Sequence, residues 1–161
     1  MWSQNNSKKG EIEDEKIIEI RLDLDTSEEV ISYLSDILFQ RGIVKKNFCS
    51  HVIAREKQYP TGLAINGDFS IAIPHTDSIY VNRPQIALAT LSHPIVFKDM
   101  VDASKNVNVS LVFLIAMSNP HEQPQLLNNL LTMCQQPNVV KEILKAKTSY
   151  AVYKILQIHN L

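Results

Sequence analysis

Two of the five histidines stand where an imidazole can take part in chemistry. His75 follows the apolar run 71–73 and Pro74, so we expect it just beyond the carboxyl end of a buried strand. Open α/β sheets bind their ligands in the crevice outside the carboxyl ends of the strands. Because a neutral imidazole is a nucleophile near pH 7, His75 is the first candidate catalytic residue, with an exposed loop histidine as the alternative.

The second candidate, His121, lies in the segment 119–124, between an apolar strand and the helix that follows. Either Asn119 or Gln123 fits the position that caps this helix, and the two prolines of the segment are accepted in a first turn. Both choices place His121 near a helix N-terminus, where backbone N–H groups favour an anion. We therefore expect His121 to share one crevice with His75, unless it is a solvated turn residue.

Arg55 begins a polar run that leads into the loop at 59–62. A guanidinium near a loop can hold a phosphate or a carboxylate through two hydrogen bonds, although such a residue more often pairs with a neighbour on a helix surface. The other histidines have no partner pattern. We expect structural or surface positions on a helix, in a turn and at the chain end for His51, His93 and His159, in that order.

Several other chemistries lack their sequence signals. His75, Asp77 and His121 contain possible metal ligands, but no HExxH motif or CxxC pair accompanies them, so we expect no metal. A serine hydrolase is not favoured, because there is no GxSxG motif and Ser70 lies within an expected strand. No glycine-rich phosphate loop is present, so we expect no nucleotide and no other cofactor.

The composition is that of one globular domain. The chain has 161 residues, of which 45% are hydrophobic, enough to bury a core without disulfide or metal support. Lys and Arg number 16 and Asp and Glu 17, a balance that argues against a nucleic-acid binder. No apolar run approaches a membrane span and no signal peptide is visible, so we expect a cytoplasmic protein with Cys49 and Cys134 as reduced thiols.

Local patterns predict the elements that must position these residues. A polar tail over residues 1–16 has no periodicity and is expected to be disordered, so the folded domain spans 17–161. Alternation of apolar and charged residues over 17–24 predicts an edge strand. Further strands are expected over 69–73, 85–91 and 107–116. Helices are expected between a capping box at Thr26 and a stop at Gly42, and over 47–57, 126–134, 139–144 and 149–158.

The strand over 107–116 decides the fold class. It alternates up to Leu111, but residues 112–116 are apolar throughout, so this half must be covered on both faces. Helices packed on both sides of a sheet provide that cover. We therefore predict a three-layer α/β/α sandwich with a central mixed β-sheet.

Three segments stand out together by their order and spacing: Ala54-Arg55-Glu56, Pro60-Thr61-Gly62 and Ala72-Ile73-Pro74-His75. They resemble the EIIA domains of the sugar phosphotransferase system (PTS), in the mannitol and fructose superfamily. The form Tyr59-Pro60-Thr61-Gly62, together with Leu126-Leu127 and Gln135-Gln136-Pro137, is most similar to the galactitol-type branch. The likeness covers about residues 17–158 and implies the α/β fold of mannitol- and fructose-type EIIA.

The resemblance implies a phosphoryl relay in the uptake of a sugar or polyol. His75 matches the histidine that accepts a phosphoryl group from phospho-HPr and passes it to a cysteine of EIIB, which serves the membrane permease EIIC. Arg55 matches the arginine beside the phosphohistidine, and His121 the second active-site histidine of mannitol- and fructose-type members. Thr61 and Thr76 are further candidates to bind the phosphoryl oxygens. Such a transfer requires neither a metal nor a nucleotide, since the phosphoryl group arrives already activated on nitrogen.

Two other functions stay open. A regulatory protein that resembles nitrogen-type EIIA, or the EIIA-like domains of transcription activators, would use phosphorylation to change its affinity for a partner. A non-catalytic scaffold of the same fold would not be phosphorylated at all.

Overall fold

The computed structural model describes residues 16–65, 69–118 and 123–161. The predicted tail over 1–16 lies outside the described residues except for Lys16. No helix in these three ranges has the length and apolar character to cross a membrane. The elements follow in the order β1 (Ile17–Leu22), α2 (Ser27–Gln40), α3 (Phe48–Gln58), β2 (Gly62–Ala64), β3 (Ser70–Ala72), a 3-10 turn (Ser78–Tyr80), β4 (Gln85–Lys98), β5 (Asn106–Ala116), α4 (Gln123–Cys134), α5 (Pro137–Lys145) and α6 (Ser149–Ile158).

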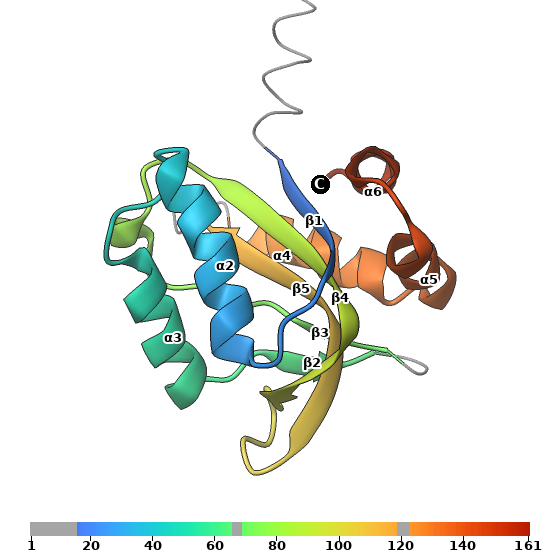
Figure 1. The fold of residues 1–161 in the computed structure, drawn as a ribbon, viewed down its shortest axis with the longest axis horizontal. Coiled ribbons are helices and arrows are strands. Elements are labelled where there is room, and N and C mark those ends of the chain that lie inside the picture. Colours follow the sequence, from blue (N-terminus) through green and yellow to red (C-terminus); the bar gives the residue numbers. More distant parts are fainter. Residues whose placement is uncertain (1–15, 66–68, 119–122) are drawn as a thin grey trace, which may run out of the picture.

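Five strands form one mixed sheet in the order β1-β4-β5-β3-β2. β1 is parallel to β4 and β3 is parallel to β5, whereas the β4–β5 and β2–β3 pairs are antiparallel. Figure 1 shows α2 and α3 on one face of this sheet and α4, α5 and α6 on the other. The predicted three-layer α/β/α sandwich with a mixed sheet is confirmed, and β1 lies at an edge as expected.

Each face of the sheet carries its own apolar core, and β5 contributes to both. Successive side chains of a strand point to opposite faces. Val112 and Leu114 accordingly join the core under α2 and α3, whereas Phe113 and Ile115 join the core under α4, α5 and α6. Burial on both faces is the reason that residues 112–116 are apolar without alternation.

The helices lie within a few residues of their predicted ranges. Helix α2 begins at its expected cap, where the Thr26 hydroxyl accepts a hydrogen bond of 3.2 Å from the Glu29 N–H. It ends before Gly42, whose φ of 70° is a left-handed conformation that glycine adopts readily. The capping and stop signals in the sequence therefore correspond to real helix ends.

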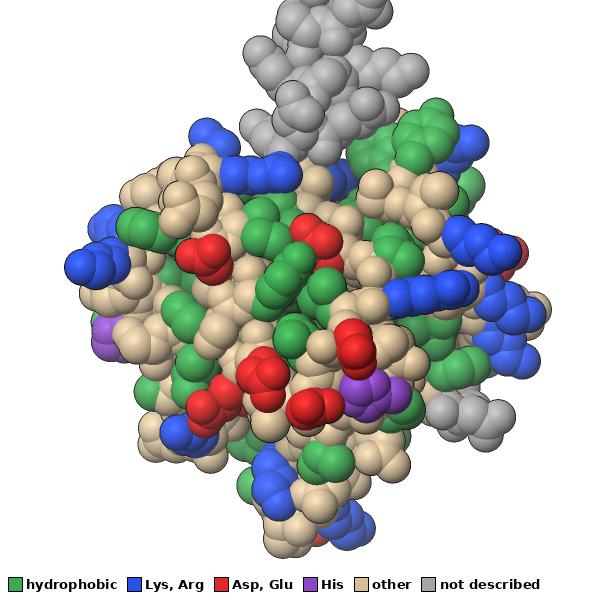
Figure 2. Space-filling view, viewed as in Figure 1, with side chains coloured by type: hydrophobic (Ala, Val, Ile, Leu, Met, Phe, Trp, Pro, Cys, Tyr) green, Lys and Arg blue, Asp and Glu red, His purple; other side chains and the backbone are tan. Residues whose placement is uncertain are grey.

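Strand β4 runs well beyond the predicted range 85–91, so the expected turn at His93 is wrong. The strand continues through Pro94, and its pairing with β5 shifts register there, an irregularity that tolerates a proline. The His93 ring nitrogens lie 3.6 Å and 3.4 Å from the carboxylates of Asp23 and Asp25. Figure 2 shows a histidine among acidic side chains on this face of the molecule.

Strand β2 was not expected, because three residues are too few to show alternation. The turn between β4 and β5 folds back onto it, and the Met100 N–H donates a hydrogen bond of 2.7 Å to the Gly62 carbonyl. A Cβ atom at Gly62 would lie 2.4 Å from both the Lys98 carbonyl oxygen and the Val107 Cγ2. The close approach of this turn to β2 therefore requires glycine at position 62.

We predict that Gly62→Ala destabilises the protein, because the added methyl group meets a backbone carbonyl that cannot move without disturbing the sheet. Forcing a methyl group into a packed region costs about 1–3 kcal/mol. Chemical denaturation should show this loss, with Gln157→Ala on the exposed face of α6 as a control expected to stay within about 0.5 kcal/mol. Equal stability of the Gly62→Ala variant and the control would contradict the close packing of the turn on β2.

Candidate active site

His75 is held at the end of β3 by the neighbouring strand. The Ile115 N–H of β5 donates a hydrogen bond of 3.0 Å to the Pro74 carbonyl, and His75 forms an isolated bridge with Ile115. Proline at 74 also fixes the backbone as it leaves the sheet. The structure thus confirms the predicted position of His75, just beyond the carboxyl end of a buried strand.

The His75 ring is fixed in one tautomer by a hydrogen bond to its own turn. Its Nδ1 lies 2.9 Å from the Ile73 carbonyl oxygen. A carbonyl oxygen only accepts, so Nδ1 must carry the proton and donate. In the neutral ring Nε2 is then the unprotonated nitrogen, and it has the lone pair that a nucleophile needs.

The surroundings of His75 keep the ring neutral. Partial burial lowers its pKa below the ordinary histidine value, since a charged imidazolium loses solvation there. The positive charge of Arg55 lowers the pKa further, whereas the Ile73 hydrogen bond and the carboxylate of Asp77 raise it. The two lowering effects outweigh the two that raise it, so the nucleophilic form dominates near neutral pH.

Arg55 reaches the site from the last turns of α3. Its Nε–H is buried and has no hydrogen-bond partner among the described residues. The guanidinium carbon lies 5.5 Å from the centroid of the Tyr59 ring, which places a cation over an aromatic face. A buried donor without a partner is costly, so an acceptor brought to this side chain would be stabilising.

A cavity of about 300 Å³ joins these residues. Its polar lining residues are Arg55, Gln58, Thr61 and His75. Exposed apolar side chains from the end of α3 and from the turn between β4 and β5 also line it. The exposed rim residues are Tyr59, Met100 and Val101, and Val101 is 88% accessible. The cavity therefore combines a nucleophile, a cation and an apolar border.

Below the cavity, Glu56 and Thr61 form a tight hydrogen-bonded pair. The Glu56 carboxylate accepts bonds of 2.9 Å from both the N–H and the hydroxyl of Thr61. The Thr61 hydroxyl oxygen in turn accepts a bond of 3.2 Å from the Ile73 N–H. Burial raises the pKa of Glu56, and the bonds from Thr61 oppose that rise.

The structure brings together three of the five residues expected at the site, namely Arg55, Thr61 and His75. Thr76 is buried, 7% accessible, and is not among the residues that line the cavity. His121 lies outside the described residues.

Two contributions to the site escape sequence analysis. Glu56 stands inside the segment that carries the resemblance, but a charged residue beside Arg55 on a helix reads as a surface residue. The turn that brings Met100 and Val101 to the cavity depends on the length and bend of β4, which the sequence pattern does not show.

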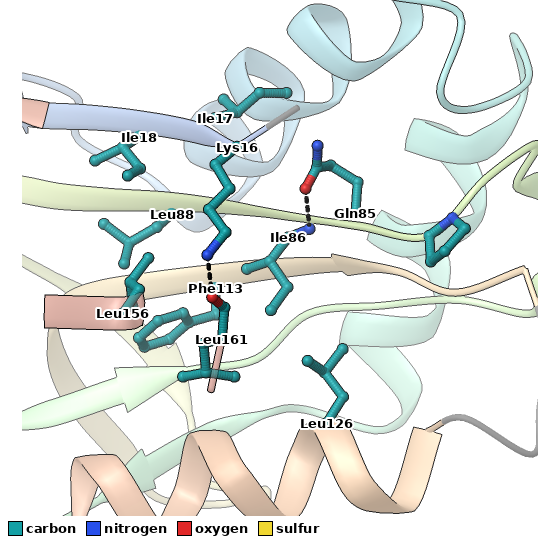
Figure 3. A pocket seen from close by; sticks show the side chains of 11 residues that line it. Lys16, Ile17, Ile18, Gln85, Ile86, Leu88, Phe113, Leu126, Leu156 and Leu161 are labelled. Atoms are coloured by element: carbon teal, nitrogen blue, oxygen red, sulfur yellow. Dashed lines mark hydrogen bonds between the residues drawn. The ribbon is translucent and has the colours of Figure 1, made fainter. Parts of the chain in front are cut away.

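Another cavity, of about 190 Å³, lies between the sheet and the helices α4 and α6 (Figure 3). Its lining is almost wholly apolar, and the Lys16 ammonium beside it donates a hydrogen bond to the Leu161 carbonyl. It offers no nucleophile, so it is not a candidate for the chemistry. In the ranges that the structure describes, no group of three His, Cys, Asp or Glu side chains is placed to hold a metal ion.

Comparison with known proteins identifies the family of the chain. Residues 11–158 match the model of the family described as phosphoenolpyruvate-dependent sugar phosphotransferase system, EIIA 2. The chain belongs to this family of phosphotransfer proteins.

Three similar proteins illustrate the range of the family. The PTS system galactitol-specific EIIA component of Escherichia coli K12 is 31% identical over 116 residues, 72% of this chain and 76% of that protein. The transcriptional regulator ManR of Bacillus subtilis 168 is 31% identical over 119 residues, 73% of this chain but 17% of the regulator. The structure is similar to a complex of enzyme IIAMTL and phosphorylated enzyme IIBMTL from Escherichia coli, with a TM-score of 0.72, 22% identity, and coverage of 87% of this chain and 93% of that one.

We predict that His75 titrates below the ordinary histidine pKa of about 6.5, and that Arg55→Gln raises its pKa because a neighbouring positive charge is removed. Titration of the ring signals by NMR measures both effects. Lys57→Gln removes a positive charge from the same helix, but that ammonium pairs with Glu28 on the surface, so this control should leave the pKa of His75 unchanged. A pKa of His75 that does not respond to Arg55→Gln would contradict the proximity of the two side chains.

Proposed function

We propose that this protein is the EIIA component of a sugar or polyol phosphotransferase system, and that His75 carries the phosphoryl group. One observation carries the proposal: a neutral imidazole, protonated on Nδ1, lines the same cavity as Arg55. The buried Nε–H donor of Arg55 has no partner among the described residues. Phosphoryl transfer needs mainly a positioned nucleophile and a cation for the phosphoryl oxygens, and the cavity offers both.

In the proposed step, the Nε2 lone pair of His75 attacks phosphorus in line with the nitrogen–phosphorus bond of phospho-HPr. The new nitrogen–phosphorus bond forms as the old one breaks, and its electron pair returns to the imidazole of the donor. No proton has to leave His75, because Nδ1–H stays bonded to the Ile73 carbonyl and stabilises the positive charge that develops on the ring. The second transfer, to a cysteine of EIIB, reverses this displacement with the thiolate sulfur as nucleophile.

Arg55 is the proposed ligand of the phosphoryl oxygens, since a guanidinium donates to a phosphate in a fork geometry. We propose His121 as a second donor, on the family resemblance alone. Thr61 also lines the cavity, but its hydroxyl hydrogen is donated to Glu56. Its proposed contribution is therefore to accept the hydrogen bond from the Ile73 N–H. Thr76 is buried and does not line the cavity, so no contact with the phosphoryl oxygens is proposed for it.

The two partners dock in turn over the same cavity in this proposal. Exposed Tyr59, Met100 and Val101 form an apolar border around it, which suits brief contacts with two different proteins. The likeness to a galactitol-specific EIIA component supports a galactitol-type system, with EIIB as the acceptor and the permease EIIC further along.

We predict that incubation with phosphoenolpyruvate, EI and HPr adds one acid-labile phosphoryl group, and that His75→Gln abolishes it because the nucleophilic nitrogen is lost. Intact mass before and after mild acid measures the group. The control is His93→Gln, which removes an imidazole held by surface carboxylates and should label as the natural chain does. Labelling that persists in His75→Gln would contradict the assignment.

A regulatory role is the second candidate, and the likeness to the transcriptional regulator ManR favours it. Such a protein accepts the phosphoryl group but uses it to change its affinity for a partner. Mixing the labelled chain with a galactitol-type EIIB separates the two functions. Transfer to the EIIB cysteine supports transport, whereas a stable label on His75 with altered binding to a regulatory partner supports control.

A further inference from the structure

Glu56 lies next to Arg55 on α3, and both of its carboxylate oxygens accept hydrogen bonds from Thr61, in the loop that follows the helix. We propose that Glu56 is a positioning residue for the phosphoryl-transfer reaction, acting through Thr61 and Ile73 to hold the His75 ring with Nδ1 protonated. The inference rests on the proposed function of His75, but its structural part can be measured without any phosphoryl transfer.

The Thr61 hydroxyl has one hydrogen to donate. That hydrogen is donated to the Glu56 carboxylate over 2.9 Å, and a carboxylate can only accept. The Ile73 N–H can only donate, so the hydroxyl oxygen accepts its hydrogen bond at 3.2 Å while the hydroxyl hydrogen is held by Glu56. The negative charge on Glu56 thus fixes the orientation of the Thr61 hydroxyl, whose oxygen is left to accept from Ile73.

Ile73 connects Thr61 to the His75 imidazole. Its N–H is held by Thr61, and its carbonyl oxygen accepts the Nδ1–H of His75 over 2.9 Å. The same residue is therefore fixed on one side by the chain from Glu56 and on the other side by the catalytic ring. Displacement of Ile73 would loosen the bond that leaves Nε2 unprotonated.

Glu56 has no other hydrogen-bonding role in the part of the chain that the structure describes, since both of its oxygens are used by Thr61. Exposed carboxylates on the neighbouring surface, such as Glu28, pair with lysine instead. A half-buried carboxylate is disfavoured by lost solvation and is retained at a cost. In this proposal, the positioning of His75 is the functional gain that offsets the lost solvation of the Glu56 carboxylate.

Glu56→Gln tests the proposal with almost no change in volume. The amide places a donor opposite the Thr61 hydroxyl, so the direction of the bond is reversed and the hydroxyl loses its fixed acceptor. We expect the nitrogen-15 shifts of His75 to show a mixture of tautomers in place of the Nδ1–H form. We also expect the rate of His75 phosphorylation by phospho-HPr to fall about 10-fold to 100-fold, because a small misplacement of a reacting atom has effects of that size.

Variants of Thr61 separate positioning from folding. Thr61→Ser keeps the hydroxyl and should retain the tautomer, whereas Thr61→Val keeps the shape but removes the link and should reproduce the effect of Glu56→Gln on the tautomer. Because Glu56 acts through Thr61, the double variant should lose no more than the Thr61→Val variant alone. If Glu56→Gln does not fold, the Ser and Val pair at 61 still decides the question.

Glu28→Gln is the matched control, since it makes the same change at a surface carboxylate paired with Lys57. An unchanged His75 tautomer in both Glu56→Gln and Thr61→Val would overturn the proposal, even if the rate fell. Additive losses in the double variant would overturn it as well. If the natural chain is not phosphorylated, the proposed function fails, but the tautomer measurement still supports or overturns the link from Glu56 to His75.

Discussion

The hydrogen bond from Nδ1 of His75 to the Ile73 carbonyl is the interaction on which the rest of the site depends. It closes a short turn around Pro74, between Ile73, which directly follows β3, and His75. Without this bond either ring nitrogen can carry the proton, and the neutral ring then has no defined nucleophilic atom. With it, the neighbouring charge of Arg55 and partial burial keep the ring neutral, and one nitrogen is left for chemistry.

The neighbouring strands hold this short turn in place. β3 has three residues and gains its stability from its neighbours, with β5 on one side and β2 on the other. β5 is buried by helices on both faces, and its Ile115 N–H fixes the carbonyl of Pro74. On the other side, the close packing at Gly62 holds the turn between β4 and β5 against β2, where it borders the cavity.

The sequence alone predicts the parts of this arrangement that rest on local patterns. The apolar run at 112–116 indicates a sheet covered on both faces, the capping signals locate α2, and the Ile-Pro-His segment locates the candidate nucleophile at a strand end. The resemblance adds Arg55 as its companion. These features are visible because each depends on residues that are adjacent or one helical turn apart.

What the sequence does not predict depends on contacts between distant segments. The short β2 exists because β3 and the β4–β5 turn pack beside it, and the bend of β4 at Pro94 was expected to be a turn. The hydrogen bonds between Glu56 and Thr61 form because the end of α3 and the loop after it bring the two residues together. In each case the local pattern is short or ambiguous, and tertiary packing decides the outcome.

The most direct test of this account is to identify the ring nitrogen that carries the phosphoryl group. The chain is labelled with nitrogen-15, phosphorylated through EI and HPr, and examined by nitrogen-15 and phosphorus-31 NMR while the acid-labile group is present. The account predicts the phosphoryl group on Nε2 of His75, with Nδ1 still protonated and bonded to the Ile73 carbonyl. A phosphoryl group on Nδ1 would contradict it, because that nitrogen cannot hold the carbonyl and the phosphorus at the same time.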